Sequence, residues 1–192
     1  ALGLIRLGLG EENEAEKAFR MALQLDAGNA LAHHNLGDVW FTRKEFARAE
    51  ECYQEALRYK PDFPEAHNSM GQLLRQQHQY DQAIVHFARV IALDPNEFNA
   101  YHSLAAVLRE QNRNEQSQSV LEQAIRLKPD FAEAWHDLGV TLLALKKNAE
   151  GIAALEKSVA IKPELDLAYL NLSSHYYELG LVDVTLSYLG RA

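Results

Sequence analysis

The sequence predicts an all-α protein built as an α-solenoid of stacked antiparallel helix pairs. Four of its five prolines lie 34 residues apart, at positions 61, 95, 129 and 163. Similar stretches recur around them, as in YKPDFPEAHNSMG and LKPDFAEAWHDLG. Apolar residues within each period are spaced three and four apart, which is typical of amphipathic helices. Repetition at this period indicates units that cannot bury their apolar faces alone and therefore stack on their neighbours.

Each period contains two helices, here called helix A and helix B. Helix A carries a glycine position followed three residues later by a bulky side chain, which is Trp40, Leu74, Leu108, Leu142 or Tyr176. Helix B carries a small residue and, four positions later, a large apolar one, which is Phe19, Tyr53, Phe87, Leu121, Leu155 or Leu189. Short helices approach closely only where side chains are small, so these positions predict the contact between helices A and B. For the unit at 64–97 we expect helix A near 64–77 and helix B near 80–93.

The ends of the helices also carry signals. The repeated proline ends the preceding helix, because it lacks an N–H and clashes with the turn before it. Asp62 with Glu65, and Asp130 with Glu133, have the spacing of a capping box at the start of helix A. Glycines at positions 10 and 180 predict left-handed C-terminal caps of helix A in the first and last units.

The repeated pattern resembles the tetratricopeptide repeat, whose signature is W-x2-L-G-x2-Y…A-x3-F…P over about 34 residues. The unit at 30–63 supplies, at the eight signature places, His33, Leu36, Gly37, Trp40, Ala49, Tyr53, Ala56 and Pro61. The departures elsewhere are Ala105 and Ser173 for glycine, Ala27 for proline and Arg6 for tyrosine, and the last predicts that the first unit packs poorly.

The resemblance covers the whole chain and implies a right-handed superhelix. We expect a single array over residues 1–192, with the first and last repeats incomplete. Its six units are approximately 1–29, 30–63, 64–97, 98–131, 132–165 and 166–192. Since both outer units stop inside a repeat, we expect the chain to be a piece of a longer protein.

The resemblance also implies a function, because helices A of such arrays line a concave groove in which peptides lie. We therefore expect a protein-interaction scaffold or adaptor whose ligand is a protein or peptide. Arg75 and Arg109 are the expected charged anchors, with Phe41 and Tyr177 as apolar contacts. The full set of expected groove residues is His34, Asp38, Phe41, Asn68, Gln72, Arg75, His102, Arg109, His136 and Tyr177. An alternative is that the array recruits substrates for a larger enzyme, such as a glycosyltransferase or sulfotransferase, whose catalytic domain lies outside this chain.

Several residues are of types that can act in catalysis or metal binding, but we interpret each of them as structural. His136 precedes Asp137, but neighbours in sequence do not face each other on a helix, which argues against a proton relay. The histidines of successive helices A form a row whose helices are about 8–10 Å apart, too widely spaced for a metal site, and HExxH is absent. Cys52 is expected to be a small packing residue. We therefore expect no catalytic residue, no metal and no cofactor in this chain.

Composition limits the partners. The net charge of −8 argues against nucleic acid, which requires a basic surface. No apolar run approaches the roughly 20 residues that span a membrane, and a single cysteine favours the cytoplasm, although the compartment stays open. The last unit is apolar on more than one face, which predicts self-association. Its apolar residues are Leu181, Val182, Val184, Leu186, Tyr188 and Leu189.

Overall fold

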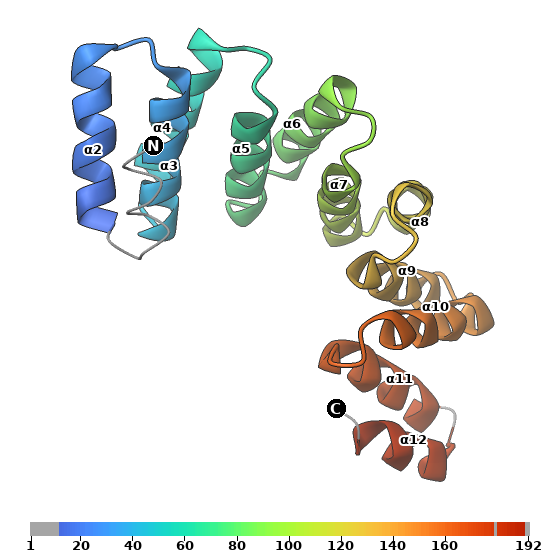
Figure 1. Ribbon diagram of the computed structural model, residues 1–192. Coiled ribbons are helices and arrows are strands. Elements are labelled where there is room, and N and C mark those ends of the chain that lie inside the picture. The colour runs from blue at the N-terminus through green and yellow to red at the C-terminus, as the bar shows by residue number, and fades with distance from the viewer. Residues whose placement is uncertain (1–11, 179, 191–192) are drawn as a thin grey trace. The chain divides into compact units, whose positions relative to one another are not determined.

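The protein is described here from a computed structural model that places residues 12–178 and 180–190, where it forms eleven helices and no strand (Figure 1). The chain divides into two compact units, Ala1–Pro95 and Asn96–Ala192. The all-α solenoid class predicted from the sequence is confirmed. That the chain is one array of six repeats stays a prediction, and helix A of the first repeat lies outside the described residues.

The helices follow one another with short turns. The described helices of the first unit are α2 (Glu12–Leu25), α3 (Ala30–Thr42), α4 (Phe46–Tyr59), α5 (Pro64–Gln76) and α6 (Tyr80–Leu93). Those of the second unit are α7 (Phe98–Glu110), α8 (Asn114–Leu127), α9 (Ala132–Ala144), α10 (Asn148–Ile161), α11 (Asp166–Glu178) and α12 (Val182–Leu189). The bounds of α5 and α6 agree with the predicted helices A and B to within one residue.

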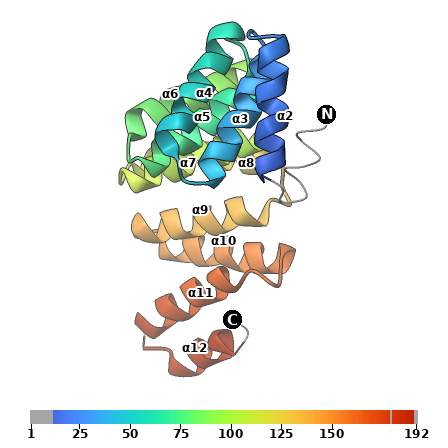
Figure 2. The same cartoon turned by 90° about the vertical axis from the view of Figure 1, so that its left-hand side faces the viewer.

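Within each unit, every described helix A packs against its own helix B, and α3, α5, α9 and α11 also pack against the helix B before them (Figures 1 and 2). Successive helices A also touch, α3 with α5 in the first unit and α7 with α9 in the second. The described helices A are therefore α3, α5, α7, α9 and α11, and the helices B are α2, α4, α6, α8, α10 and α12. Residues on neighbouring helices A can thus form one surface inside a unit.

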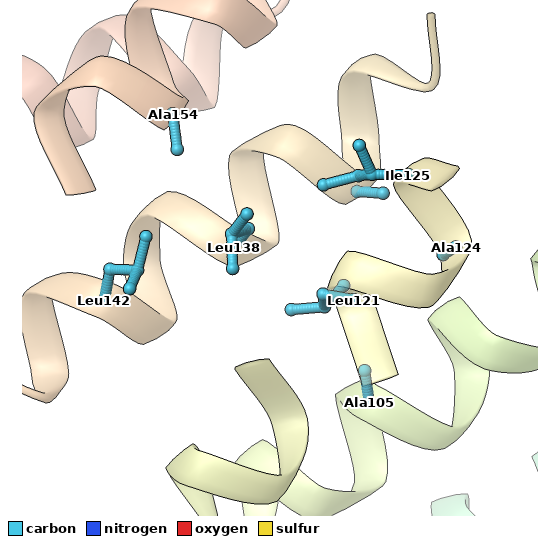
Figure 3. Close-up of a cluster of buried hydrophobic side chains, with 8 residues drawn as sticks. Ala105, Leu121, Ala124, Ile125, Leu138, Leu142 and Ala154 are labelled. Atoms are coloured by element: carbon cyan, nitrogen blue, oxygen red, sulfur yellow. The ribbon is translucent and has the colours of Figure 1, made fainter. Parts of the chain in front are cut away.

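The predicted contact between small and large residues is present. The Phe87 ring is fully buried over Gly71, where an added Cβ would lie 2.8 Å from two ring carbons. In the second unit Leu121 of α8 and Leu138 of α9 belong to one apolar cluster that also includes alanines of α7 and α10 (Figure 3). The core of each unit is therefore a series of such contacts between adjacent helices.

The predicted capping boxes are wrong. In α5 and α9 the N-cap residues are Phe63 and Phe131 instead of Asp62 and Asp130, and neither helix has a side-chain cap hydrogen bond. Phe63 is buried in a cluster with Ala56 of α4 and Ala66 of α5. Asp62 instead forms an ion pair with Arg89 of α6.

The turn from helix A to helix B contains a left-handed residue. Gly180 has φ 73°, as predicted, whereas Gly10 lies outside the described residues. At 34-residue intervals before Gly180, the same conformation is adopted by Lys44, His78, Asn112 and Lys146. At the first of these, Lys44 N donates to Phe41 O at 2.9 Å and Glu45 N donates to Trp40 O at 2.9 Å, which is a Schellman motif. These hydrogen bonds hold non-glycine residues in a conformation they otherwise disfavour.

Candidate functional site

The first unit has a hollow of about 260 Å³ on its helix A surface. Helix α3 contributes Asp38, Phe41 and Thr42, helix α5 contributes Asn68, Ser69 and Gln72, and Tyr53 comes from α4. Four of these, Asp38, Phe41, Asn68 and Gln72, were predicted from the sequence. The fold therefore brings together residues that lie one repeat apart in the chain.

Asp38 is the only charged residue among those that line this hollow. Its Oδ1 accepts hydrogen bonds from the Tyr53 hydroxyl at 2.8 Å and from Ser69 Oγ at 3.3 Å. Its Oδ2 lies 3.7 Å from His34 Nε2, which is too far for a hydrogen bond. Burial, followed by the Asp38 carboxylate, raises the pKa of Tyr53, so this phenol stays protonated and keeps donating. The carboxylate is thus fixed through one oxygen while the other has no hydrogen bond.

His34 lies beneath the predicted groove surface, with only 8% of the residue exposed. Its Nε2 is 3.0 Å from Ser69 Oγ, and its ring packs against Phe63. Since the Ser69 proton is donated to Asp38, His34 Nε2 carries its own proton and Nδ1 is a buried acceptor with no partner. A catalytic histidine must receive the serine proton instead, so these three residues do not form a nucleophilic triad.

A polar network crosses the helix A surface of the second unit. Asp137 on α9 accepts from His102 Nε2 on α7 at 3.1 Å, and its other oxygen lies 3.4 Å from an Arg109 nitrogen. His136 Nδ1 donates to Asp137 at 3.0 Å, and its Nε2 accepts from Asn171 Nδ2 on α11 at 2.8 Å. The premise that His136 and Asp137 do not face each other is therefore wrong. Adjacent positions are separated by only about 100° around a helix, and both side chains turn toward the surface shared with α7 and α11.

The network sets the charge of this surface. Burial alone would raise the pKa of Asp137, but hydrogen bonds from His102 and His136 and the positive charge of Arg109 outweigh it and hold that pKa well below its usual range. The carboxylate is therefore ionised at any physiological pH and faces the Arg109 guanidinium. Arg109, expected to be a ligand anchor, is thus already paired with an acid of its own unit.

One spacing underlies both polar arrangements. The side chain of the fifth residue of one helix A forms a hydrogen bond with the side chain of the sixth residue of the next helix A. The two residues are therefore separated in the sequence by one repeat plus one residue. The pairs are His34–Ser69, His102–Asp137 and His136–Asn171, each 35 residues apart. This spacing could have been found in the sequence, since both rows of residues were visible there. It shows that the polar rows connect successive repeats as well as lining a surface.

The remaining predicted groove residues are less enclosed. Arg75 is half-exposed on α5. Tyr177 is 70% exposed on α11, and Leu167 and Leu170 of the same helix are also exposed. Among the described residues, no group of three or more histidine, cysteine, aspartate or glutamate side chains could hold a metal ion. Cys52 is half-buried, and burial together with Glu51 raises the pKa of its thiol to about 11.

The apolar residues at the C-terminal end of the second unit are largely exposed to solvent. Five of the six predicted residues are exposed, namely Leu181, Val182, Val184, Leu186 and Leu189. The sixth, Tyr188, is half-buried, with its ring stacked on Tyr176 at 5.6 Å and its hydroxyl donating to Glu156. Of the helices described, none is long and apolar enough to cross a membrane.

The helix pairs and their helix A surfaces define a repeat scaffold for protein interaction. A tetratricopeptide repeat model matches residues 6–73, and a model of the anaphase-promoting complex, cyclosome, subunit 3 matches residues 76–158. The chain belongs to the tetratricopeptide-repeat family. No curated protein matches it.

Several solved structures share the fold. The pilF protein of Pseudomonas aeruginosa is 22% identical over 97% of this chain and 85% of its own, with a TM-score of 0.86. MamA is 25% identical over 81% of this chain and 91% of its own, with a TM-score of 0.73. YrrB, described as a tetratricopeptide-repeat protein with an unusual peptide-binding site, is 23% identical over 86% of each chain, with a TM-score of 0.72.

Proposed function

We propose that this chain is a scaffold that binds a peptide segment of a partner protein on the helix A surfaces of its repeats. The observation that carries the proposal is the hollow on α3 and α5. It contains an aromatic ring, Phe41, two side-chain amides, and one carboxylate that is held in place by its own hydrogen bonds. A concave surface with a few oriented polar groups is the usual form of a ligand site.

The similarity to YrrB supports the proposal, since that protein is described as having a peptide-binding site. The two polar arrangements give further support. Each fixes the orientation of side chains on a helix A surface, which lowers the entropic cost of binding a ligand there. Peptides would then be recognised by shape and by distributed hydrogen bonds.

The test is a display of random peptides against the whole chain and two triple variants. Phe41→Ala, Asn68→Ala and Gln72→Ala together remove side chains from the hollow. The control combines Glu51→Ala, Gln82→Ala and Val85→Ala, which change exposed side chains of helices B in the same unit. We expect the first variant to lose the peptides that the wild type selects and the control to retain them. Equal selection by all three proteins would refute the proposal.

A further inference from the structure

We propose that the hollow on α3 and α5 is a pocket for one positively charged side chain, lysine or arginine, of the bound peptide. This inference rests on the proposed function and names the chemistry of its ligand. It differs from the sequence-based expectation, in which arginines of this chain would anchor an acidic ligand. The hollow contains the opposite charge, because Asp38 is its single ionisable acid and the other lining groups are neutral or protonated.

The carboxylate has one oxygen available for a new donor. Oδ1 already receives two hydroxyl hydrogen bonds, from Tyr53 and Ser69. Oδ2 accepts no hydrogen bond from the residues that the structure describes, and the His34 Nε2 atom lies 3.7 Å from it. The Asp38 side chain is still 33% exposed, so a ligand can reach it. Neutral hydroxyl donors orient the carboxylate but do not neutralise it. A lysine or arginine nitrogen would supply both the missing hydrogen bond and the missing charge.

The other residues that line the hollow suit a side chain with an aliphatic part and a positively charged end. The Phe41 ring is half-exposed and held against Phe46 at 5.8 Å, and an aromatic face attracts a nearby cation. Thr42 also lines the hollow, and its hydroxyl proton is donated to Asp38 O at 2.9 Å, so its oxygen can act toward a ligand only as an acceptor. The hollow of about 260 Å³ corresponds to roughly eight waters at about 30 Å³ each, which is room for one long side chain.

The alternatives fit less well. An acidic side chain would be repelled by Asp38, and a neutral apolar one would cover Oδ2 without giving it a donor, which is unfavourable. The net charge of the chain, −8, attracts a basic peptide at long range. Arg75, three residues after Gln72 on α5, is not one of the residues that line the hollow.

The inference is tested by titrating the full chain with small probes while recording ¹H–¹⁵N NMR spectra. The cationic probes are Nα-acetyl-arginine amide and Nα-acetyl-lysine amide, and the neutral ones are the corresponding citrulline and norleucine compounds. We expect the cationic probes to shift the side-chain amide signals of Asn68 and Gln72 saturably. Asp38→Asn, which keeps an acceptor for Tyr53, should weaken this binding about tenfold, the usual loss for a hydrogen bond to a charged group. Glu51→Gln, an equal charge change on an exposed site, should leave it unchanged.

The cation pocket would be overturned if citrulline bound as tightly as arginine, or if neither cationic probe gave a saturable shift. Equal arginine binding by the wild type and Asp38→Asn would also do so. Comparison of the arginine and lysine probes identifies the preferred side chain. The peptide display separates this inference from the proposed function. Selection of peptides that depends on Phe41 but shows no enrichment in basic residues would leave the groove standing and refute the cation pocket. Binding of the cationic probes without any selection of peptides would leave the cation site standing and refute the proposed peptide-binding function.

Discussion

Replacing Gly71 by alanine should destabilise the first unit, although alanine is normally the better helix former. An added Cβ would lie 2.8, 2.8 and 3.1 Å from three carbons of the Phe87 ring. The ring is fully buried, so neighbouring side chains restrict its movement. Alanine gains about 1 kcal/mol in helix propensity over glycine, whereas overpacking a core costs about 1–3 kcal/mol. We therefore expect a net loss of about 1 kcal/mol in the free energy of unfolding, within a range of about 0–2 kcal/mol.

The second unit supplies the matched control. There the glycine position is occupied by Ala105, and the residue packed against it from helix B is Leu121. In a Phe87→Leu background, Gly71→Ala should consequently be neutral or stabilising by up to about 1 kcal/mol. The two changes should therefore couple by about 2 kcal/mol, within the range for residues in contact.

The assay is urea unfolding of the four proteins of this double-mutant cycle. The chain has two tryptophans, Trp40 in the first unit and Trp135 in the second, so a Trp135→Phe background makes fluorescence report the first unit alone. If Gly71→Ala stabilises the protein by about 1 kcal/mol in both backgrounds, the Phe87 ring is not seated on the glycine and the packing argument is wrong.

Three further predictions follow from single residues. Burial, followed by neighbouring His67, lowers the pKa of His86 from 6.5 to about 4, so the fold favours its neutral form and loses stability as pH falls from about 6.5 toward 4. His86→Gln should remove roughly 2 kcal/mol of this loss in the free energy of unfolding. The urea midpoint should then change less between pH 7 and pH 4 than in the wild type, and an unchanged pH dependence would contradict the prediction. Lys146→Gly should raise the free energy of unfolding by about 0.5–1 kcal/mol, seen as a higher urea midpoint, because Lys146 has φ 62°; a lower midpoint would mean that the lysine side chain stabilises the turn. The open apolar end should support self-association in analytical ultracentrifugation, weakened by Leu186→Asp but not by Leu25→Asp on α2; a monomer at high concentration would rule it out.

Much of the fold could be predicted because the interactions that specify it are repeated. The 34-residue period repeats a contact between a small residue of helix A and a large residue of helix B, as at Gly71 and Phe87, so one pattern is seen several times in a single chain. Helix starts were predicted less well. The aspartate of the PDF sequence has capping-box spacing, but the phenylalanine that follows it occupies the N-cap in α5 and α9. Burial of the phenylalanine ring outweighs a hydrogen bond that water can replace.

The site could be predicted only in part. Asp38, Phe41, Asn68 and Gln72 were identified from their places on helix A, and they do line one hollow. The contribution of Tyr53 from helix B was missed, because it was assigned only to the core. Its ring is in the core, but its hydroxyl reaches the surface carboxylate at 2.8 Å.

The sequence by itself determined the helix pairs, their period, the small and large residues that join them, and the rows of polar residues along helices A. These depend on local periodicity and on side-chain size, which are visible in the chain. Only the tertiary structure decided which polar groups are already paired. His34 is buried under Ser69, Arg109 faces Asp137, and Asp38 keeps one oxygen without a hydrogen bond. Such pairing depends on distances of a few ångströms between side chains that are 28 to 35 residues apart in the sequence, and hydrogen bonds are lost at larger separations.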